Sequence, residues 1–297
     1  MKIGIIPNTS KENVSNLIRT IIEKLNSHSL TYFISSSISN EFDDEEIDSS
    51  LFLNNDDIFN VSDIIVSLGG DGTMLNTAFH ARNYKVALAG VNFGKLGFLA
   101  EIDLSNLEDF LCYIKSGNYT TDERIALEGV SSSRPDEKLY AINDIVIDKG
   151  PWPKMIEITL KVDEDYVSTF SADGIIIATP TGSTGYSLSV GGPIVSPNAD
   201  AITLSPISPH TLTMRPLVVS TNQKISVEIR FPNRQVQVSC DGQRVYTYEA
   251  PVTIEITKSK NPVRLVHVPE TNYYQILRNK LFWGLDVRNE KYEKGLK

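Results

Sequence analysis

Hydrophobic positions in the first 120 residues follow two different periods in turn. Short apolar runs at 2–6, 30–34, 63–68 and 86–91 are typical of buried strands. After the first run, apolar residues recur at helical spacing and predict one buried stripe: Val14, Leu17, Ile18, Ile21, Ile22 and Leu25. Because strands alternate with helices here, we expect parallel pairing in an α/β layer.

Two further segments complete this first region. Ser105 to Glu108 reads as a capping box at the start of a helix whose apolar stripe ends before Gly117. Residues 41–57 carry eight acidic residues and no basic one. We interpret that acidic stretch as a solvated surface segment and assign no function to it.

The pattern changes near residue 120, where the hydrophobic period becomes two. Clean alternation at 156–162, 225–229, 236–238 and 252–256 predicts strands with one buried face. We therefore expect an α/β domain with a mainly parallel sheet at 1–120 and an all-β sandwich domain at 121–269. The tail, 270–297, is predicted to be helical and to return to the first domain.

Composition narrows the possible functions. The net charge of −9 argues against non-specific nucleic-acid binding, which needs a basic surface. No apolar run is long enough to span a membrane, and no secretory signal begins the chain. Cys112 and Cys240 lack zinc-type spacing, and no histidine has a metal-ligand partner at helical spacing. We expect a cytoplasmic protein whose own residues bind no metal.

The first segment that suggests chemistry is Gly69-Gly70-Asp71-Gly72-Thr73, between a buried strand and a helix. Glycines at such a position let backbone N–H groups approach a phosphate, and the helix N-terminus favours the anion. A carboxylate is unfavourable there unless it has a task, and Asp71 could accept a proton from a hydroxyl nucleophile. Alone, the segment is equally compatible with a glycine turn and a solvated aspartate.

Three other segments are polar and follow or begin strands. Residues 173–193 run from a strand into a loop rich in Gly, Ser and Thr, where Tyr186 could stack on a flat base. Asn143-Asp144 could bind a ribose or an adenine edge. Asp241-Gly242 lies between alternating runs and predicts a hairpin turn, with Gln243 beside it. Taken singly, each is more often a turn than a binding site.

Taken together and in this order, these segments resemble the ATP-NAD kinase family. Leu96 to Leu99, Ser208 to Leu212, Arg215 to Leu217 and the tail segment Leu277 to Gly284 also match, so the resemblance runs nearly end to end. The GGDG segment is shared with lipid kinases and phosphofructokinases, whereas 173–193 is highly specific. The resemblance implies transfer of a phosphoryl group from ATP to the 2′-hydroxyl of NAD's adenosine ribose, with Mg²⁺ bridging the phosphates. It also implies a homodimer or homotetramer.

The resemblance also assigns roles to individual residues. Asp71 matches the proton acceptor, and the ATP phosphates would lie near Gly69, Gly70, Gly72 and Thr73. The positions matched to NAD contacts are Asp71, Gly72, Phe98, Asn143, Asp144, Lys154, Asp173, Thr184, Gly185, Tyr186, Ser187, Leu188, Ser189 and Gln243. The chain departs from the family at Asp144, where Glu is common, and at Gly185, where Ala is usual.

Two other functions remain open at this stage. A lipid or sugar kinase of the GGDG superfamily shares the first segment, but not the 173–193 loop. A non-catalytic dinucleotide sensor would bind NAD, but it would have no need of Asp71. A substrate panel with ATP separates the first from an NAD kinase, and NAD binding without NADP formation would identify the second.

Overall fold

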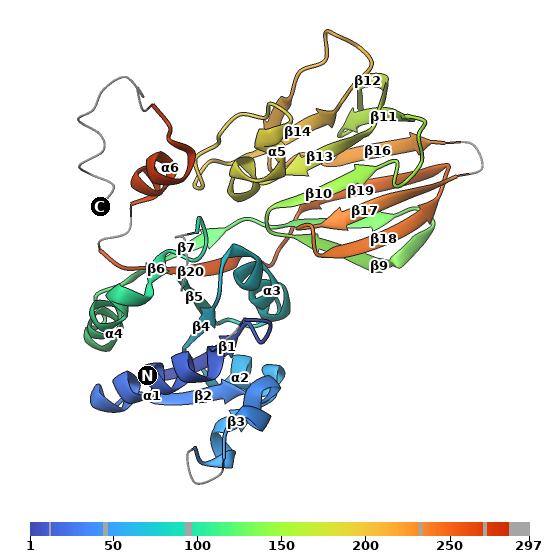
Figure 1. Ribbon diagram of the computed structural model, residues 1–297. Helices are drawn as coiled ribbons and strands as arrows, with labels where there is room; N and C mark the ends of the chain where they lie inside the picture. The colour runs from blue at the N-terminus through green and yellow to red at the C-terminus, as the bar shows by residue number, and fades with distance from the viewer. Residues whose placement is uncertain (12, 44–46, 93–96, 232–233, 270–271, 285–297) are drawn as a thin grey trace. The chain divides into compact units, whose positions relative to one another are not determined.

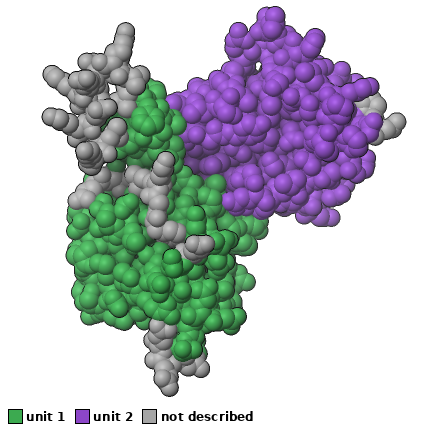
Figure 2. All heavy atoms as spheres, in the orientation of Figure 1, with its two compact units in different colours: residues 1–122, 264–297 green, residues 123–263 purple. Residues whose placement is uncertain are grey.

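The computed structural model describes residues 1–297 except 12, 44–46, 93–96, 232–233, 270–271 and 285–297. The chain divides into two compact units, coloured separately in Figure 2. Unit 1 comprises 1–122 and 264–297, and unit 2 comprises 123–263. The strand β20 (Val263–His267), which the alternating pattern grouped with the second domain, pairs in parallel with β5 (Ala87–Asn92) of unit 1.

Unit 1 is built on an eight-stranded sheet (Figure 1). Its strand order is β3-β2-β1-β4-β5-β20-β7, with β6 paired to β5. The pairs from β3 to β20 along this order are parallel, which confirms the predicted layer. The remaining strands of the sheet are β1 (Lys2–Pro7), β2 (Thr31–Ser35), β3 (Phe52–Leu53), β4 (Ile64–Leu68), β6 (Ile102–Asp103) and β7 (Thr120–Arg124).

The helices of unit 1 bury the stripes that their spacing indicates. In α1 (Val14–Ser27), the described core includes five of the six predicted positions, and Leu17 is partly buried. The helix α4 (Leu107–Ser116) ends at Gly117, whose φ of 73° fits the left-handed cap. The other helices are α2 (Asn55–Val61), α3 (Asp71–Ala81) and α6 (Tyr273–Leu281), with 3₁₀ turns at Ser36–Glu41, Ser49–Leu51 and Leu104–Asn106.

One local prediction in unit 1 was wrong. The expected capping box does not form, because α4 has no side-chain cap and Asp103 instead accepts from Ser105 N at 2.9 Å. The described part of the acidic stretch is mostly exposed, as predicted, although it buries Ile47 and includes the start of α2.

Unit 2 consists of two six-stranded antiparallel sheets that share one core. One sheet has the order β15-β14-β13-β10-β17-β18, and the other has the order β12-β11-β16-β19-β8-β9. Their bounds are β8 (Leu127–Ser131), β9 (Arg134–Ala141), β10 (Asp144–Asp148), β11 (Ile156–Val162), β12 (Asp165–Ala172), β13 (Gly174–Ala178), β14 (Ala201–Ile207), β15 (Leu217–Ser220), β16 (Ile225–Arg230), β17 (Gln235–Cys240), β18 (Arg244–Glu249) and β19 (Val252–Lys258). The sandwich and the return of the tail to unit 1 confirm the predicted fold class.

The strands β10 and β13 are buried on both faces, which explains their unbroken apolar sequence. Ile145 and Ile175 point into the core between the sheets. On the opposite face, Val146 and Ile176 form a second small cluster, against which Val190 packs. Val190 directly follows the short helix α5 (Tyr186–Ser189), so the 181–193 loop folds back over its own sheet.

Candidate active site

The Gly69–Thr73 segment forms the turn from β4 into α3 (Figure 1). Gly69 N donates to Val91 O at 2.9 Å, and a Cβ at Gly69 would overlap the Thr73 hydroxyl. Asn8 Nδ2 at the end of β1 donates to Thr73 Oγ1 at 3.0 Å. The turn is therefore held between two neighbouring strands at the carboxyl edge of a parallel sheet, where open α/β sheets bind ligands.

The Asp71 carboxylate is the first side chain of α3, and three consecutive backbone N–H groups donate to it. Oδ2 accepts from Phe98 N at 2.9 Å, and Oδ1 accepts from Leu99 N at 2.9 Å and Ala100 N at 3.0 Å. A Cβ at Gly97 would overlap Asp71 Oδ1, so only glycine lets this turn approach the carboxylate. The predicted base is thus held in one orientation, with its side chain 30% exposed.

Residues of α6 and the 97–100 turn surround the same carboxylate. Lys280 Nζ lies 3.4 Å from Asp71 Oδ2 and 4.9 Å from the centroid of the Phe98 ring. The Phe98 ring also lies 6.3 Å from that of Tyr273. Leu96, the first residue of the family-like segment here, lies outside the described residues.

A second group of predicted residues meets at one end of a unit 2 sheet. The antiparallel strand β10 lies between β13 and β17, so its start lies beside both of their ends. Asn143 and Asp144 stand at that start, the 181–189 loop follows β13, and Asp241 follows β17. Three segments that are distant in sequence thereby form one cluster.

Asp241 organises this cluster. Its Oδ1 accepts from the backbone N–H groups of Ile142 at 2.9 Å and Asn143 at 2.7 Å, with Asp144 N at 3.4 Å. Its Oδ2 pairs with Arg244 at 2.7 Å. Asp241 and Gly242 have φ angles of 55° and 65°, the left-handed geometry of the predicted hairpin turn.

The cluster contains polar groups that the described residues leave without hydrogen bonds. Asn143 Oδ1 and Thr181 Oγ1 are buried, and neither has a hydrogen-bond partner in the described structure. Asp144 is 5% exposed, and burial together with the charge of Asp241 raises its pKa to about 7. Because buried polar groups are normally paired, these atoms indicate a site that a polar ligand completes.

The 181–189 loop lies against the start of β10. A Cβ at Gly182 would overlap the Asn143 carbonyl, and Thr179 N donates to that carbonyl at 2.9 Å. The Tyr186 side chain is 47% exposed, while Ser187 is buried and shares a 2.9 Å hydrogen bond with Ser205. Of the other predicted loop residues, Thr184 and Leu188 are half-buried, and Gly185 and Ser189 are exposed.

Asp173 and Lys154 lie elsewhere in unit 2. Asp173 precedes β13 and lies beside Lys149, just past the far end of β10, about 17 Å from Asp144 by the strand rise. Its carboxylate pairs with Lys149 at 2.7 Å, and Lys154 is exposed. Gln243 is exposed next to the hairpin turn.

The structure places several residues in or beside the predicted site that sequence analysis did not identify. Lys280, Asn8 and Lys149 carry no local motif, because their partners lie at least 24 residues away in sequence. Thr181 was included only as part of the loop. Asp241 was interpreted as a turn residue, and only the fold reveals the backbone N–H groups that donate to its carboxylate.

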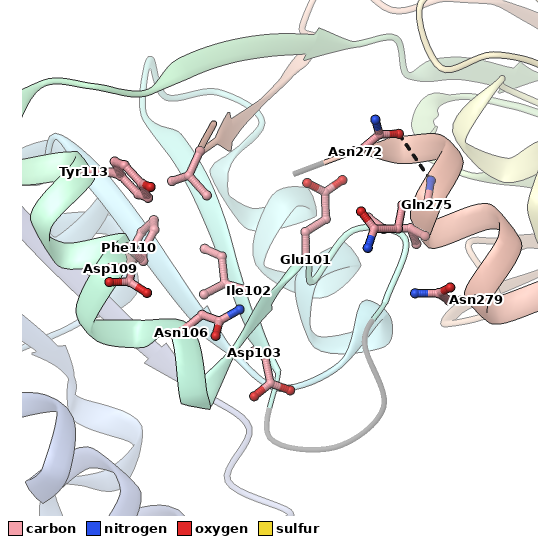
Figure 3. A pocket seen from close by; sticks show the side chains of 12 residues that line it. Glu101, Ile102, Asp103, Asn106, Asp109, Phe110, Tyr113, Asn272, Gln275 and Asn279 are labelled. Atoms are coloured by element: carbon pink, nitrogen blue, oxygen red, sulfur yellow. Dashed lines mark hydrogen bonds between the residues drawn. The ribbon is translucent and has the colours of Figure 1, made fainter. Parts of the chain in front are cut away.

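A cavity of about 240 Å³ in unit 1 contains none of the predicted site residues (Figure 3). It lies between α4, β6 and α6, and its lining includes Glu101, Asp103 and Asp109. Glu101 is itself paired with His267 at 2.9 Å. Because carboxylates repel phosphates, we assign this cavity no substrate. No group of three or more metal-ligating side chains occurs among the described residues.

Comparisons with known proteins show which family the chain resembles over nearly its whole length. Residues 3–119 match the ATP-NAD kinase N-terminal domain, and 142–268 match the ATP-NAD kinase C-terminal domain. The NAD kinase of Thermoanaerobacter pseudethanolicus is 38% identical over 282 residues, covering 94% of this chain and 98% of its own length. That of Flavobacterium johnsoniae is 34% identical over 296 residues, covering 97% and 100%.

Two solved structures are also similar. Yeast NADH kinase in complex with NADH has a TM-score of 0.87 at 25% identity, over 97% of this chain and 89% of the yeast chain. An NAD kinase from Archaeoglobus fulgidus in complex with ATP has a TM-score of 0.72 at 26% identity, over 95% and 98%. With both domain models matched and relatives aligned over almost their whole length, the chain belongs to the ATP-NAD kinase family.

Proposed function

We propose that this chain transfers a phosphoryl group from ATP to the 2′-hydroxyl of NAD's adenosine ribose, with Asp71 as the general base. The observation that carries the proposal is the Asp71 carboxylate, which three backbone N–H groups orient at the glycine turn after β4. A ribose hydroxyl is a poor nucleophile, so the base must lie within ~3 Å of it during transfer.

The NAD-binding part of the proposal rests on unit 2. Asn143 Oδ1 and Thr181 Oγ1 are buried and lack partners among the described residues, as a site for a ribose or an adenine edge requires. Exposed Tyr186 offers a ring for stacking on a base. The proposed NAD contacts remain Phe98, Asn143, Asp144, Lys154, Asp173, Gln243 and the loop from Thr184 to Ser189, with Asp71 and Gly72 at the reacting ribose.

The ATP phosphates would bind at Gly69, Gly70, Gly72 and Thr73. This turn leads into the N-terminus of α3, where the helix dipole favours anions. We propose that Mg²⁺ arrives with ATP as part of the substrate, held by phosphate oxygens. The absence of a metal-ligand cluster among the described residues is compatible with that role. Bound there, the ion offsets charge on the phosphates.

The positions of Asp173 and Lys154 support a homo-oligomer, either a dimer or a tetramer. Asp173 lies at the opposite end of β10 from Asn143, and Lys154 lies near it, because it precedes Ile156, which pairs with Ala172. One dinucleotide at the Asn143 end would thus meet them most simply on a neighbouring copy of the chain. We also propose a cytoplasmic location. No described helix is long and apolar enough to cross a bilayer.

A coupled assay for NADP formation from NAD, ATP and Mg²⁺ tests the activity. We expect Asp71→Asn to lower kcat by about 10²–10⁴-fold, because it removes the base, while NAD affinity stays within a few-fold. Calorimetric titration with NAD and the melting temperature of the variant provide the controls. Near-normal turnover in that variant would remove Asp71 as the base, and NAD binding without any NADP formation by the wild-type protein would contradict the activity.

A further inference from the structure

Backbone N–H groups of the described residues fill three of the four acceptor positions of the Asp71 carboxylate. A carboxylate offers about four lone-pair positions, two on each oxygen. Leu99 N and Ala100 N fill both positions on Oδ1, and Phe98 N takes one on Oδ2. A substrate hydroxyl must therefore deliver its proton to the remaining position on Oδ2.

Lys280 Nζ donates a hydrogen bond of 3.4 Å to Oδ2, so an incoming hydroxyl has to share this oxygen with the ammonium or displace it. Both side chains are 30% exposed. Asp71 is the only described residue that accepts a hydrogen bond from Lys280. Because an ammonium has three donors, two of them remain for an incoming ligand.

The protein holds the ammonium at this place by more than one contact. Lys280 Nζ also lies 4.9 Å from the centroid of the Phe98 ring, in the range of a cation–π interaction. The helix that carries it, α6, is anchored by buried Ile276 and Leu277. Phe98 in turn donates its N–H to Asp71, so one turn positions both the base and the lysine.

A hydroxyl that bonds to Oδ2 shares that oxygen with Lys280, whose Nζ lies 3.4 Å from it. The hydroxyl oxygen must approach Oδ2 to about 2.6–3.2 Å, and the phosphorus that it attacks lies about 3 Å further on. We propose that Lys280 is a second catalytic residue, whose ammonium binds the acceptor oxygen and the transferring phosphoryl group. This inference rests on the proposed function, because it takes Asp71 as the base.

The step balances without a further reactant. The 2′-oxygen gives its proton to Asp71 Oδ2 as it forms a bond to the γ-phosphorus of ATP. The bond from that phosphorus to the β,γ-bridging oxygen breaks, and ADP leaves with its electron pair. Lys280 keeps its three protons, and its charge offsets the negative charge on the phosphoryl oxygens throughout.

The test compares three substitutions in α6 by steady-state kinetics of NADP formation. Lys280→Met keeps the alkyl chain against Phe98 and removes the charge, and Lys280→Ala removes both. Arg278→Ala is the matched control, because Arg278 is an exposed cation on the same helix turn, two positions away, and so does not face the same way. Melting temperatures show whether each variant is folded.

We expect both Lys280 variants to lose at least about tenfold in kcat, by comparison with the loss of a single charge-stabilising donor in other enzymes. KM for NAD should stay within about threefold, and Arg278→Ala should keep its kcat. Propylammonium, which replaces the missing methylenes and ammonium, should partly restore Lys280→Ala, while propanol should not. It should restore neither Lys280→Met, where the space is filled, nor Asp71→Asn.

The inference is overturned if folded Lys280→Met and Lys280→Ala turn over within twofold of the wild type, or if Arg278→Ala loses as much. Asp71→Asn, measured in parallel, separates this failure from failure of the proposed function. An inactive Asp71→Asn beside active Lys280 variants rejects only the role of Lys280. An active Asp71→Asn rejects the base on which both proposals depend.

Discussion

Replacing Asp144 with asparagine should stabilise unit 2 at neutral and alkaline pH. Burial and the nearby charge of Asp241 raise the Asp144 pKa from 3.8 to about 7. Between these two values the folded protein keeps a proton that the unfolded chain has released. The free energy of unfolding contributed by this group therefore falls as the pH rises from about 4 to about 7, and it is level above that.

The size of the effect follows from the pKa difference. One pKa unit corresponds to about 1.4 kcal/mol, so the wild-type protein loses up to about 4 kcal/mol across this window. Asparagine has nearly the shape of a protonated aspartate and carries no charge at any pH. The gain in the free energy of unfolding should thus grow from about zero near pH 4 to about 2–4 kcal/mol at pH 8, where the lower figure allows for water entry.

Urea unfolding followed by Trp152 fluorescence measures this gain, because Trp152 packs against the unit 2 core. Asp163→Asn is the matched control in the same unit. The backbone N–H of Lys224 and the side chain of Gln223 lower the pKa of exposed Asp163, so replacing it should give no gain at high pH. A stability difference between Asp144→Asn and wild type that does not change from pH 4 to pH 8 would refute the reasoning.

Three further results are expected. NAD affinity measured by calorimetry should rise with pH up to about 7, because the ionised Asp144 carboxylate accepts a hydrogen bond from a ribose hydroxyl. Asp144→Asn should remove this pH dependence, and a flat wild-type profile from pH 6 to 8 would contradict it. Gly97→Ala should lower kcat at least about tenfold, because the added Cβ displaces the Asp71 carboxylate. The circular dichroism spectrum should stay unchanged, and normal turnover would show that the turn adapts to the Cβ. Asp241→Asn should lower the free energy of unfolding by about 1–3 kcal/mol in urea titration and weaken NAD binding, because it removes the charge partner of half-buried Arg244. An unchanged urea midpoint would argue against this.

The fold was predictable where one period extended over many residues. The α1 stripe and the alternating strands of unit 2 each present a buried face that their spacing specifies. Prediction failed at short elements. The helix α2 has seven residues and buries only Ile58 and Phe59 among acidic neighbours, so its pattern could not be distinguished from a solvated segment. The backbone N–H of Ser105, which Glu108 would accept in a capping box, donates to the Asp103 carboxylate instead. The spacing of Ser105 and Glu108 alone does not reveal this competing acceptor.

The site was predictable only in part, for a different reason. Glycine turns and strand ends mark where Asp71 and Asn143 lie, because those residue types have local preferences. The partners of these residues are set by tertiary structure instead. Asp71 accepts from N–H groups 27 to 29 positions later in the chain, and Lys280 is 209 positions away. No local pattern encodes such a pairing.

Asp71, Asp144 and Asp241 differ in the hydrogen bonds that their carboxylates accept, and this difference indicates which of them stabilise the fold and which one binds a ligand. Asp71 and Asp241 each accept from three consecutive backbone N–H groups of a distant segment, so each fixes a turn as well as its own orientation. No described residue donates a hydrogen bond to the Asp144 carboxylate, although Asp144 is 5% exposed and Asp241 8%. Because it is buried without donors, the Asp144 carboxylate has a raised pKa and lowers the stability of the folded protein. Such a group is useful only if a bound ligand supplies the missing hydrogen-bond donors. A dinucleotide ribose, with its adjacent hydroxyl donors, is a ligand of that kind.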